Sequence, residues 1–222
     1  MTFKAGHNEP IAREALIFLI PLIFGALVAW LTDFNSVSTI LLVLAFCVAC
    51  FFRNPERKTP ADPAAVVSSA DGKVTSITSN IMSKLTNQGP YTRISVFMSV
   101  FNVHVNRWPL SGKVTRIKHI KGSFMDAREA DSSELNERNA IVLDSDFGQV
   151  EIVQIAGKIA RRIACWVRES DLVTRGERLG LIRFGSRVDI YLPDGFTVLV
   201  NEGMNVKAGV TILARAHEDT PS

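Results

Sequence analysis

Two uncharged apolar runs near the N-terminus constrain the fold of this chain more than any other feature. The runs cover residues 15–31 and 37–52, and a short polar turn separates them. A helix that crosses a bilayer needs roughly 20 apolar residues, so each run is slightly short for one span. We expect a hydrophobic helical hairpin that spans a thinned bilayer, or dips into it and returns. Two buried helices of a soluble core are the alternative.

The basic residues give this hairpin an orientation. Lys4 and Arg13 precede the first run, and Arg53, Arg57 and Lys58 follow the second, whereas the connecting turn contains neither Lys nor Arg. By the positive-inside rule, both ends of the hairpin lie in the cytoplasm. We therefore predict a protein of the cell (inner) membrane with its working domain on the cytoplasmic face. The membrane-associated hairpin is expected to end at residue 58.

The remaining residues, 59–222, have the pattern of an antiparallel β domain. Short runs rich in β-branched and aromatic residues recur about every 8–12 residues between Gly, Asn and Pro, which favours a sandwich or barrel. A turn rhythm over 200–209 resembles the closing hairpin of barrel-sandwich domains. The predicted fold class is mainly β (α+β), an antiparallel β-sandwich or barrel-sandwich-like domain preceded by the helical hairpin. The predicted strands are 66–67, 72–77, 93–97, 112–120, 140–143, 150–155, 163–167, 179–183, 187–192, 197–200 and 210–214, and residues 123–138 are expected to form a loop with a helical turn.

Composition argues against two other classes of function. The net charge is only +3, and no basic stripe with interleaved aromatic residues is present, so we expect no nucleic-acid partner. Cys47 and Cys50 lie inside the second apolar run without histidine nearby, and Cys165 lies in a predicted strand. We interpret all three as packing residues, and we expect neither a metal site nor a disulfide framework.

The dipeptide Gly185-Ser186 is the candidate for chemistry. Such a pair is usually an ordinary turn. If the serine hydroxyl attacks the preceding carbonyl, however, the amide becomes an ester, and glycine suits the preceding position because it tolerates strained backbone angles. The attack requires a base and donors for the oxyanion. Asp71, in an Asp-Gly turn, and His104, which can move protons near neutral pH, are the candidate partners.

Four motifs together resemble those of the phosphatidylserine decarboxylases. The run 173–188 contains Arg-Gly-Glu and Phe-Gly-Ser and is similar to the self-cleavage region of that family. Residues 69–74 resemble its Asp-Gly turn, residues 101–112 its histidine segment, and residues 136–139 its Asn-Glu-Arg motif. The motifs occur in the family's order over about residues 65–205, and their joint occurrence is far more specific than any one of them.

The resemblance implies an enzyme that converts phosphatidylserine to phosphatidylethanolamine at the membrane surface. Its cofactor would be a covalent pyruvoyl group, made autocatalytically from Ser186, which forms a Schiff base with the substrate amine. Cleavage between Gly185 and Ser186 would give a β chain (1–185) and an α chain (186–222) that form a heterodimer. The catalytic residues would be Ser186, His104 and Asp71, and the partners phosphatidylserine and membrane lipid. Whether the protein forms homo-oligomers stays open.

The chain also departs from the longer members of that family. Arg107 occupies the position of their second histidine, so the base for self-cleavage stays open: Asp71 and His104 share the task, or Asp71 acts through water. Arg187 stands where the longer form has threonine. Two other functions are alternatives. One is a membrane-anchored carrier or adaptor without catalytic activity, with Lys207 as its attachment point, and the other is a pyruvoyl-dependent decarboxylase of a soluble amino acid.

Overall fold

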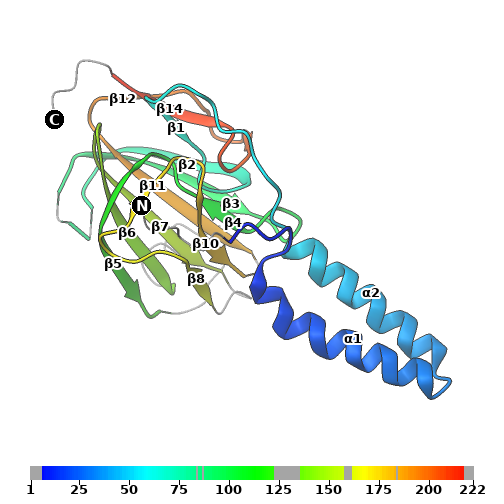
Figure 1. Cartoon of the computed structure of the whole chain (residues 1–222). Coiled ribbons are helices and arrows are strands. Elements are labelled where there is room, and N and C mark those ends of the chain that lie inside the picture. Colours follow the sequence, from blue (N-terminus) through cyan, green and yellow to red (C-terminus); the bar gives the residue numbers. More distant parts are fainter. Residues whose placement is uncertain are drawn as a thin grey trace. The chain divides into compact units, whose positions relative to one another are not determined.

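The computed structural model describes residues 7–83, 85–86, 88–122, 136–157, 162–183 and 185–217. The chain divides into two compact units, residues 1–56 and 57–222 (Figure 1). The first unit is helical and the second is built from β-strands.

The first unit is the expected helical hairpin. It consists of η1 (Arg13–Ala15), α1 (Leu16–Leu31) and α2 (Asn35–Phe51), and Figure 1 shows the two long helices side by side. Small residues at their interface allow close packing: a Cβ added at Gly25 would lie 3.4 Å from Leu41 Cδ1. The Ser38 hydroxyl donates a hydrogen bond of 2.9 Å across the interface to the Ala26 carbonyl.

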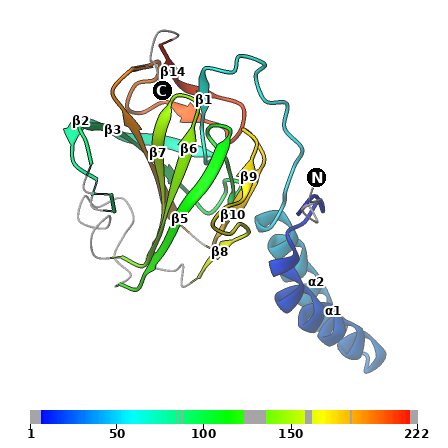
Figure 2. The same cartoon turned by 60° about the vertical axis from the view of Figure 1, so that its left-hand side comes forward.

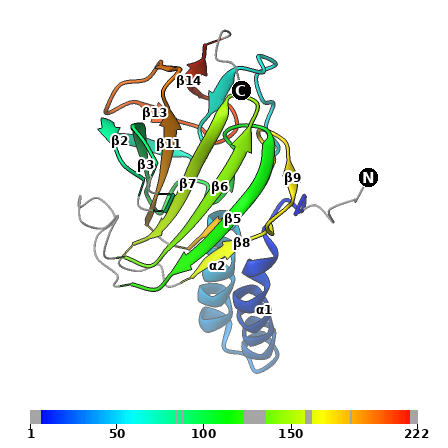
Figure 3. The ribbon, with the colours of Figure 1, turned by 90° about the vertical axis from the view of Figure 1, so that its left-hand side faces the viewer.

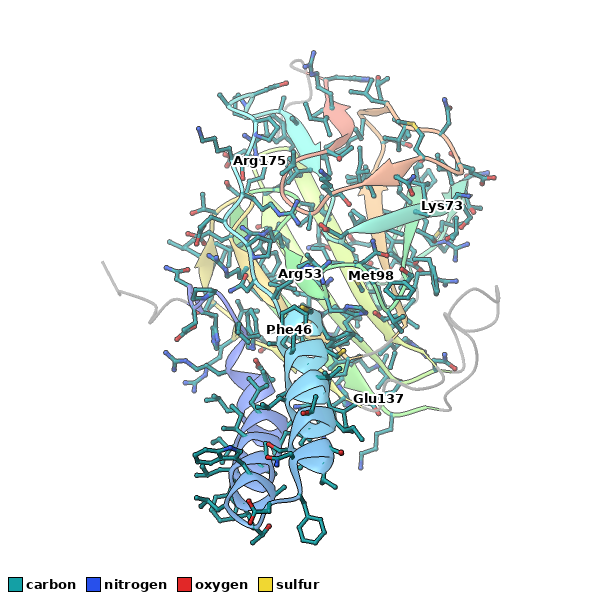
Figure 4. All side chains as sticks on the ribbon, turned by 90° about the vertical axis from the view of Figure 1, so that its right-hand side faces the viewer. Phe46, Arg53, Lys73, Met98, Glu137 and Arg175 are labelled. Carbon is teal, nitrogen blue, oxygen red and sulfur yellow. The ribbon has the colours of Figure 1, made fainter. Side chains whose placement is uncertain are left out.

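The outer surface of the hairpin is apolar. Large side chains such as Phe24 and Phe46 are exposed, which would not be expected of two helices buried in a soluble core. Phe46 is labelled in Figure 4. In the described residues, one helix, Arg13–Leu31, is long and apolar enough to cross a membrane, whereas Asn35–Phe51 is shorter. The hairpin is therefore suited to contact with lipid.

The second unit contains a curled antiparallel sheet. In the described part of the chain, its eight strands have the order β13-β2-β3-β11-β7-β6-β5-β9, and two three-stranded sheets, β1-β14-β12 and β4-β10-β8, accompany it. Figures 2 and 3 show how strongly the large sheet curves. The strands are β1 (Ala65–Val67), β2 (Gly72–Ile81), β3 (Tyr91–Met98), β4 (Val105–Arg107), β5 (Gly112–Ile120), β6 (Arg138–Ser145), β7 (Gly148–Ala156), β8 (Ile163–Cys165), β9 (Leu172–Val173), β10 (Arg178–Ile182), β11 (Ser186–Pro193), β12 (Phe196–Val198), β13 (Asn205–Val206) and β14 (Ile212–Ala216).

The core lies on the concave face of the large sheet, which we call the inner face. On β11, the alternate residues Val188, Ile190 and Leu192 are buried there with apolar residues of β3 and β7. The predicted mainly β, antiparallel architecture, preceded in the sequence by a helical hairpin, is confirmed. Strands β4, β9 and β13 were not predicted, because they have only three, two and two residues. Most of the loop expected over 123–138 lies outside the described residues.

Candidate active site

Ser186 lies where three strands of the large sheet meet at one level. It is the first residue of β11, and its partners in register are Met98, the last residue of β3 (labelled in Figure 4), and Ala156, the last residue of β7. Figure 3 shows β11 between these two strands. Ser186 is fully buried, and its Oγ has no hydrogen-bond partner among the described residues. A buried hydroxyl without a partner costs about 1–3 kcal/mol, so such a group is rare unless it serves a purpose.

Gly185 gives the chain its sharp entry into β11. Its φ of +51° lies in the left-handed region, where a side chain is strained. A Cβ added there would meet no described atom within 4 Å. Glycine is therefore needed at this position for its backbone freedom and not for lack of space.

His104 is buried immediately before β4. Its carbonyl accepts a hydrogen bond of 3.4 Å from the N–H of Ile182, the last residue of β10, four positions before Ser186. The ring nitrogen Nδ1 lies 3.0 Å from the carbonyl oxygen of Asn102. Because a carbonyl only accepts, Nδ1 carries the hydrogen in this contact, and Nε2 is then the basic nitrogen of the neutral ring.

Asp71 stands two strands away from Ser186. Gly72, the first residue of β2, is pressed against β3, so that a Cβ added there would lie 2.0 Å from the Phe97 carbonyl oxygen. At about 5 Å per strand, the Asp-Gly turn is about 10 Å from Ser186. Asp71 Oδ1 accepts a hydrogen bond of 2.8 Å from the Ala208 N–H, and Oδ2 accepts one of 2.9 Å from Arg57. One carboxylate oxygen thus holds neighbouring main chain, and the other holds the half-buried cation of Arg57.

Arg107, at the position where a second histidine was expected, holds two turns together. Its side-chain Nη1 donates a hydrogen bond of 2.7 Å to the Gly176 carbonyl, and its backbone N–H donates one of 2.9 Å to the Ser69 carbonyl. The side chain is buried, and a Cβ added at Gly209 would lie 2.8 Å from its Cδ. Since a guanidinium stays protonated, Arg107 connects the Arg-Gly-Glu turn to the segment before Asp71 and cannot act as a base.

The Asn-Glu-Arg motif holds the main chain beside Ser186. The buried Asn136 side chain donates a hydrogen bond of 2.8 Å to the Ala156 carbonyl, and the Ala156 N–H donates one of 2.9 Å to the Glu137 carbonyl. Because Ala156 pairs with Ser186, these bonds fix the strand that flanks the serine.

A chain of buried amides reaches the same place, and the sequence analysis missed it. Asn139 Nδ2 donates to Gln154 Oε1 (3.1 Å), Gln154 Nε2 donates to Asn106 Oδ1 (2.9 Å), and Asn106 Nδ2 contacts Met98 Sδ at 3.5 Å. All three amides are buried, and Met98 is the neighbour of Ser186. One signal could have revealed Gln154: it shares the parity of Val150 and Ile152 in an alternating strand, so its amide had to point into the core.

Comparison with known proteins identifies the family. A family model described as phosphatidylserine decarboxylase matches residues 44–214. The chain belongs to the phosphatidylserine decarboxylase family. The phosphatidylserine decarboxylase proenzyme of Syntrophus aciditrophicus (strain SB) is 48% identical over 205 residues, which cover 91% of this chain and 96% of that relative. The chain is therefore an enzyme, a decarboxylase of this family, and the alternative of a non-catalytic carrier is set aside.

Lys207, the attachment point of the carrier alternative, and His119 are both exposed. Lys207 is exposed in a turn after β13, with its N–H bonded to Thr211 Oγ1 at 2.9 Å. His119 lies on β5 with Nε2 3.5 Å from Glu137 Oε1. No group of three or more His, Cys, Asp or Glu side chains that could hold a metal ion occurs in the described ranges.

On the outer face of the large sheet, the convex side, this family member buries charged groups. Arg187 Nε lies 2.9 Å from Asp189 Oδ1, and Arg187 Nη2 donates a hydrogen bond of 3.1 Å to Asp189 Oδ2. Burial raises the pKa of Glu151, and the negative charge of Asp189 raises that pKa further. The Ser83 hydroxyl donates a hydrogen bond to the Glu151 carboxylate and lowers the pKa in part. Burial also raises the pKa of Tyr191 to about 12. The side chain of Arg187 thus points away from the inner face, where Ser186 lies.

Proposed function

We propose that this protein is a self-processing phosphatidylserine decarboxylase whose cofactor is a pyruvoyl group made from Ser186. It converts phosphatidylserine to phosphatidylethanolamine at the membrane surface. The observation that carries the proposal is the buried Ser186 hydroxyl, which has no partner among the described residues and directly follows a glycine in the left-handed region. The relative from Syntrophus is named a proenzyme, which agrees with processing of the chain.

An unpartnered hydroxyl alone does not single out Ser186. Ser69 and Ser95 are also fully buried, and in the described structure their hydroxyls likewise have no hydrogen-bond partner. Only Ser186 follows a glycine with positive φ, and it begins a strand that is paired on both sides. Because residue 185 is a glycine, no side chain of that residue blocks attack on its carbonyl, and the paired strand holds the Ser186 hydroxyl beside this carbonyl. It also makes Ser95 a matched control.

The proposed processing starts with attack of Ser186 Oγ on the Gly185 carbonyl carbon. The C–N bond breaks, and the chain is joined by an ester. Loss of the Ser186 Cα proton then breaks the Cβ–O bond, which leaves a carboxylate on Gly185 and dehydroalanine at residue 186. Tautomerisation to the imine and hydrolysis by water release ammonia and leave a ketone at the new N-terminus. No outside oxidant or reductant is consumed.

The residues around Ser186 suggest how the work is divided. Because Nδ1 of His104 is bonded to the Asn102 carbonyl, Nε2 is the basic nitrogen of the ring, and we assign it as the base that deprotonates Ser186 and later as the proton carrier for the substrate α-carbon. Asp71 binds Arg57 and the Ala208 N–H, so we assign it a positioning role at the start of β2. A pyruvoyl group supplies a ketone that condenses with the substrate amine and a carbonyl that withdraws electrons as carbon dioxide leaves.

The two products of cleavage would stay together. Within residues 186–222, β11 and β13 pair with strands of residues 1–185 in the large sheet, and β14 pairs with β1. The new N-terminus would therefore remain between β3 and β7. The apolar hairpin would keep this heterodimer at the inner membrane, with the catalytic domain in the cytoplasm, where a two-tailed lipid presents its head group.

Intact-mass analysis of the purified full chain tests the proposal. We expect two fragments, 1–185 and 186–222, the second with a blocked keto N-terminus, together with decarboxylation of phosphatidylserine. Ser186→Ala should remain a single inactive chain, whereas the matched control Ser95→Ala should be cleaved and active. A wild-type preparation that is fully active as one unmodified chain would refute the pyruvoyl assignment, as would an active Ser186→Ala protein.

A further inference from the structure

The turn between β3 and β4 carries exposed apolar residues directly beside the proposed active site. Phe101 is 84% exposed and Val100 43% exposed. The turn follows Met98, the neighbour of Ser186 in register, and ends at His104. Among the described residues of the second unit, the most exposed large apolar side chain thus lies in the five residues that separate Met98 from His104.

Local hydrogen bonds fix the shape of this turn. Asn102 Oδ1 accepts hydrogen bonds from the Ser99 N–H (2.9 Å) and the Ser99 hydroxyl (2.8 Å), and the Asn102 N–H donates to the Ser99 carbonyl at 3.0 Å. These bonds close a tight turn whose tip is Val100 and Phe101. The two apolar side chains are therefore held outward by a defined structure.

An aromatic side chain in this position suits a lipid interface. Single exposed apolar residues are common on soluble proteins and need no explanation by themselves. Here the substrate of the family is a two-tailed lipid, whose head group must reach the proposed site, and this turn connects Met98 to His104 in that site. Exposed apolar side chains such as Phe and Leu can insert at the boundary between head groups and acyl chains, where they leave water for an apolar surrounding.

We propose that Val100 and Phe101 form a membrane contact of the catalytic domain itself, separate from the hairpin. The tip enters the boundary between head groups and acyl chains of a phospholipid bilayer and thereby places the site at the depth of the substrate head group. The same turn holds His104, because the Asn102 carbonyl accepts from Nδ1, so the membrane contact lies beside the histidine in the chain. This inference rests on the proposed function for the identity of the site.

Depth measurement with a spin label tests the contact directly. In full-length protein with Cys47, Cys50 and Cys165 replaced by Ala, a nitroxide is attached to Phe101→Cys and, as the matched control, to Leu172→Cys. Leu172 is 77% exposed and pairs with Lys113, at the end of β5 opposite to the Ser186 level, about 20 Å along the strand. In phosphatidylserine–phosphatidylcholine vesicles we expect the label at 101 to become accessible to oxygen and shielded from a water-soluble nickel chelate, while the label at 172 stays in water. A label at 101 as open to the chelate as that at 172 would overturn the proposal.

Activity provides the second test. Phe101→Ser should lower kcat/KM about tenfold for phosphatidylserine in vesicles, because an inserted phenylalanine contributes binding of this order. It should leave self-cleavage and the turnover of monomeric short-chain phosphatidylserine unchanged, and Leu172→Ser should change none of them. An equal loss on both substrates would mean that Phe101 acts in the site and not on the membrane. Absence of cleavage in the wild-type chain would sink the proposed function, yet the spin-label result would still decide the membrane contact.

Discussion

Strand β11 has two buried faces, and their polar side chains differ in whether they are paired. On its inner face, Ser186 has no hydroxyl partner in the described structure and precedes an apolar row. On its outer face, Arg187 and Asp189 are equally buried but form an ion pair with a hydrogen bond. Neighbouring residues of one strand thus differ in whether their side chains have a partner of their own among the described residues.

This difference separates a structural role from a chemical one. A buried charge is tolerated when a partner of opposite charge compensates its loss of hydration, and such pairs hold strands in one arrangement. A buried hydroxyl without a partner does not stabilise the fold, so its presence calls for another reason. The outer face is therefore expected to determine stability, and the inner face to determine processing.

Breaking the outer ion pair should have the largest effect on stability. Arg187→Ala leaves the fully buried Asp189 carboxylate without its cation, so we expect a loss of about 3–5 kcal/mol in the free energy of unfolding. Denaturant unfolding in a Ser186→Ala background, which keeps the chain intact, measures this loss. In the cleavable background, the folded fraction should still process itself.

The double variant Arg187→Met, Asp189→Leu is the control for that prediction. It removes both charges and should recover most of the lost stability. If the single variant were as stable as the wild type, or if folded Arg187→Ala protein failed to cleave, the assignment of the outer face to stability alone would be wrong.

Interrupting the inner amide chain should lower stability less than Arg187→Ala does, but should slow self-cleavage. Asn106→Leu removes the acceptor of Gln154 Nε2, which we expect to cost about 1–3 kcal/mol of stability. Because Asn106 also contacts Met98 beside Ser186, we expect the rate of self-cleavage, followed by electrophoresis over time, to fall tenfold or more. Asn106→Asp keeps an acceptor for Gln154 and serves to separate the two effects, since it should preserve more stability than Asn106→Leu. Unaltered cleavage in folded Asn106→Leu protein would contradict the role of the amide chain.

The smallest expected effect is the pH dependence due to Glu151 on the outer face. Burial raises its folded-state pKa above the ordinary value of 4.5, so its stabilising contribution is present below that value and is lost as pH rises through the raised pKa. In this window the unfolding free energy falls by up to about 1.4 kcal/mol per pH unit. Glu151→Gln cannot ionise, so its melting temperature should exceed that of the wild type at pH 8 and approach it near pH 4. The same difference at both pH values would show that ionisation is not the cause.

The regularity of the chain made its elements predictable. The two uncharged runs led to the helices, and alternation of apolar residues led to strands such as β5, which the structure places at the predicted residues. Strands β4 and β9 carry too few residues for any period to show, because their conformation is imposed by pairing with β10 and β5.

By itself, the sequence determined the candidate scissile bond, the hairpin and the family resemblance, since these depend on residue order and local chemistry. Only the tertiary structure decided that the Ser186 hydroxyl is buried on the inner face, that Asp71 binds Arg57, and that Asn106 and Gln154 lie beside Met98. These facts depend on strand pairing between residues far apart in the chain. Hydrogen-bond partners and burial arise from such pairing, and no local pattern of residues encodes them.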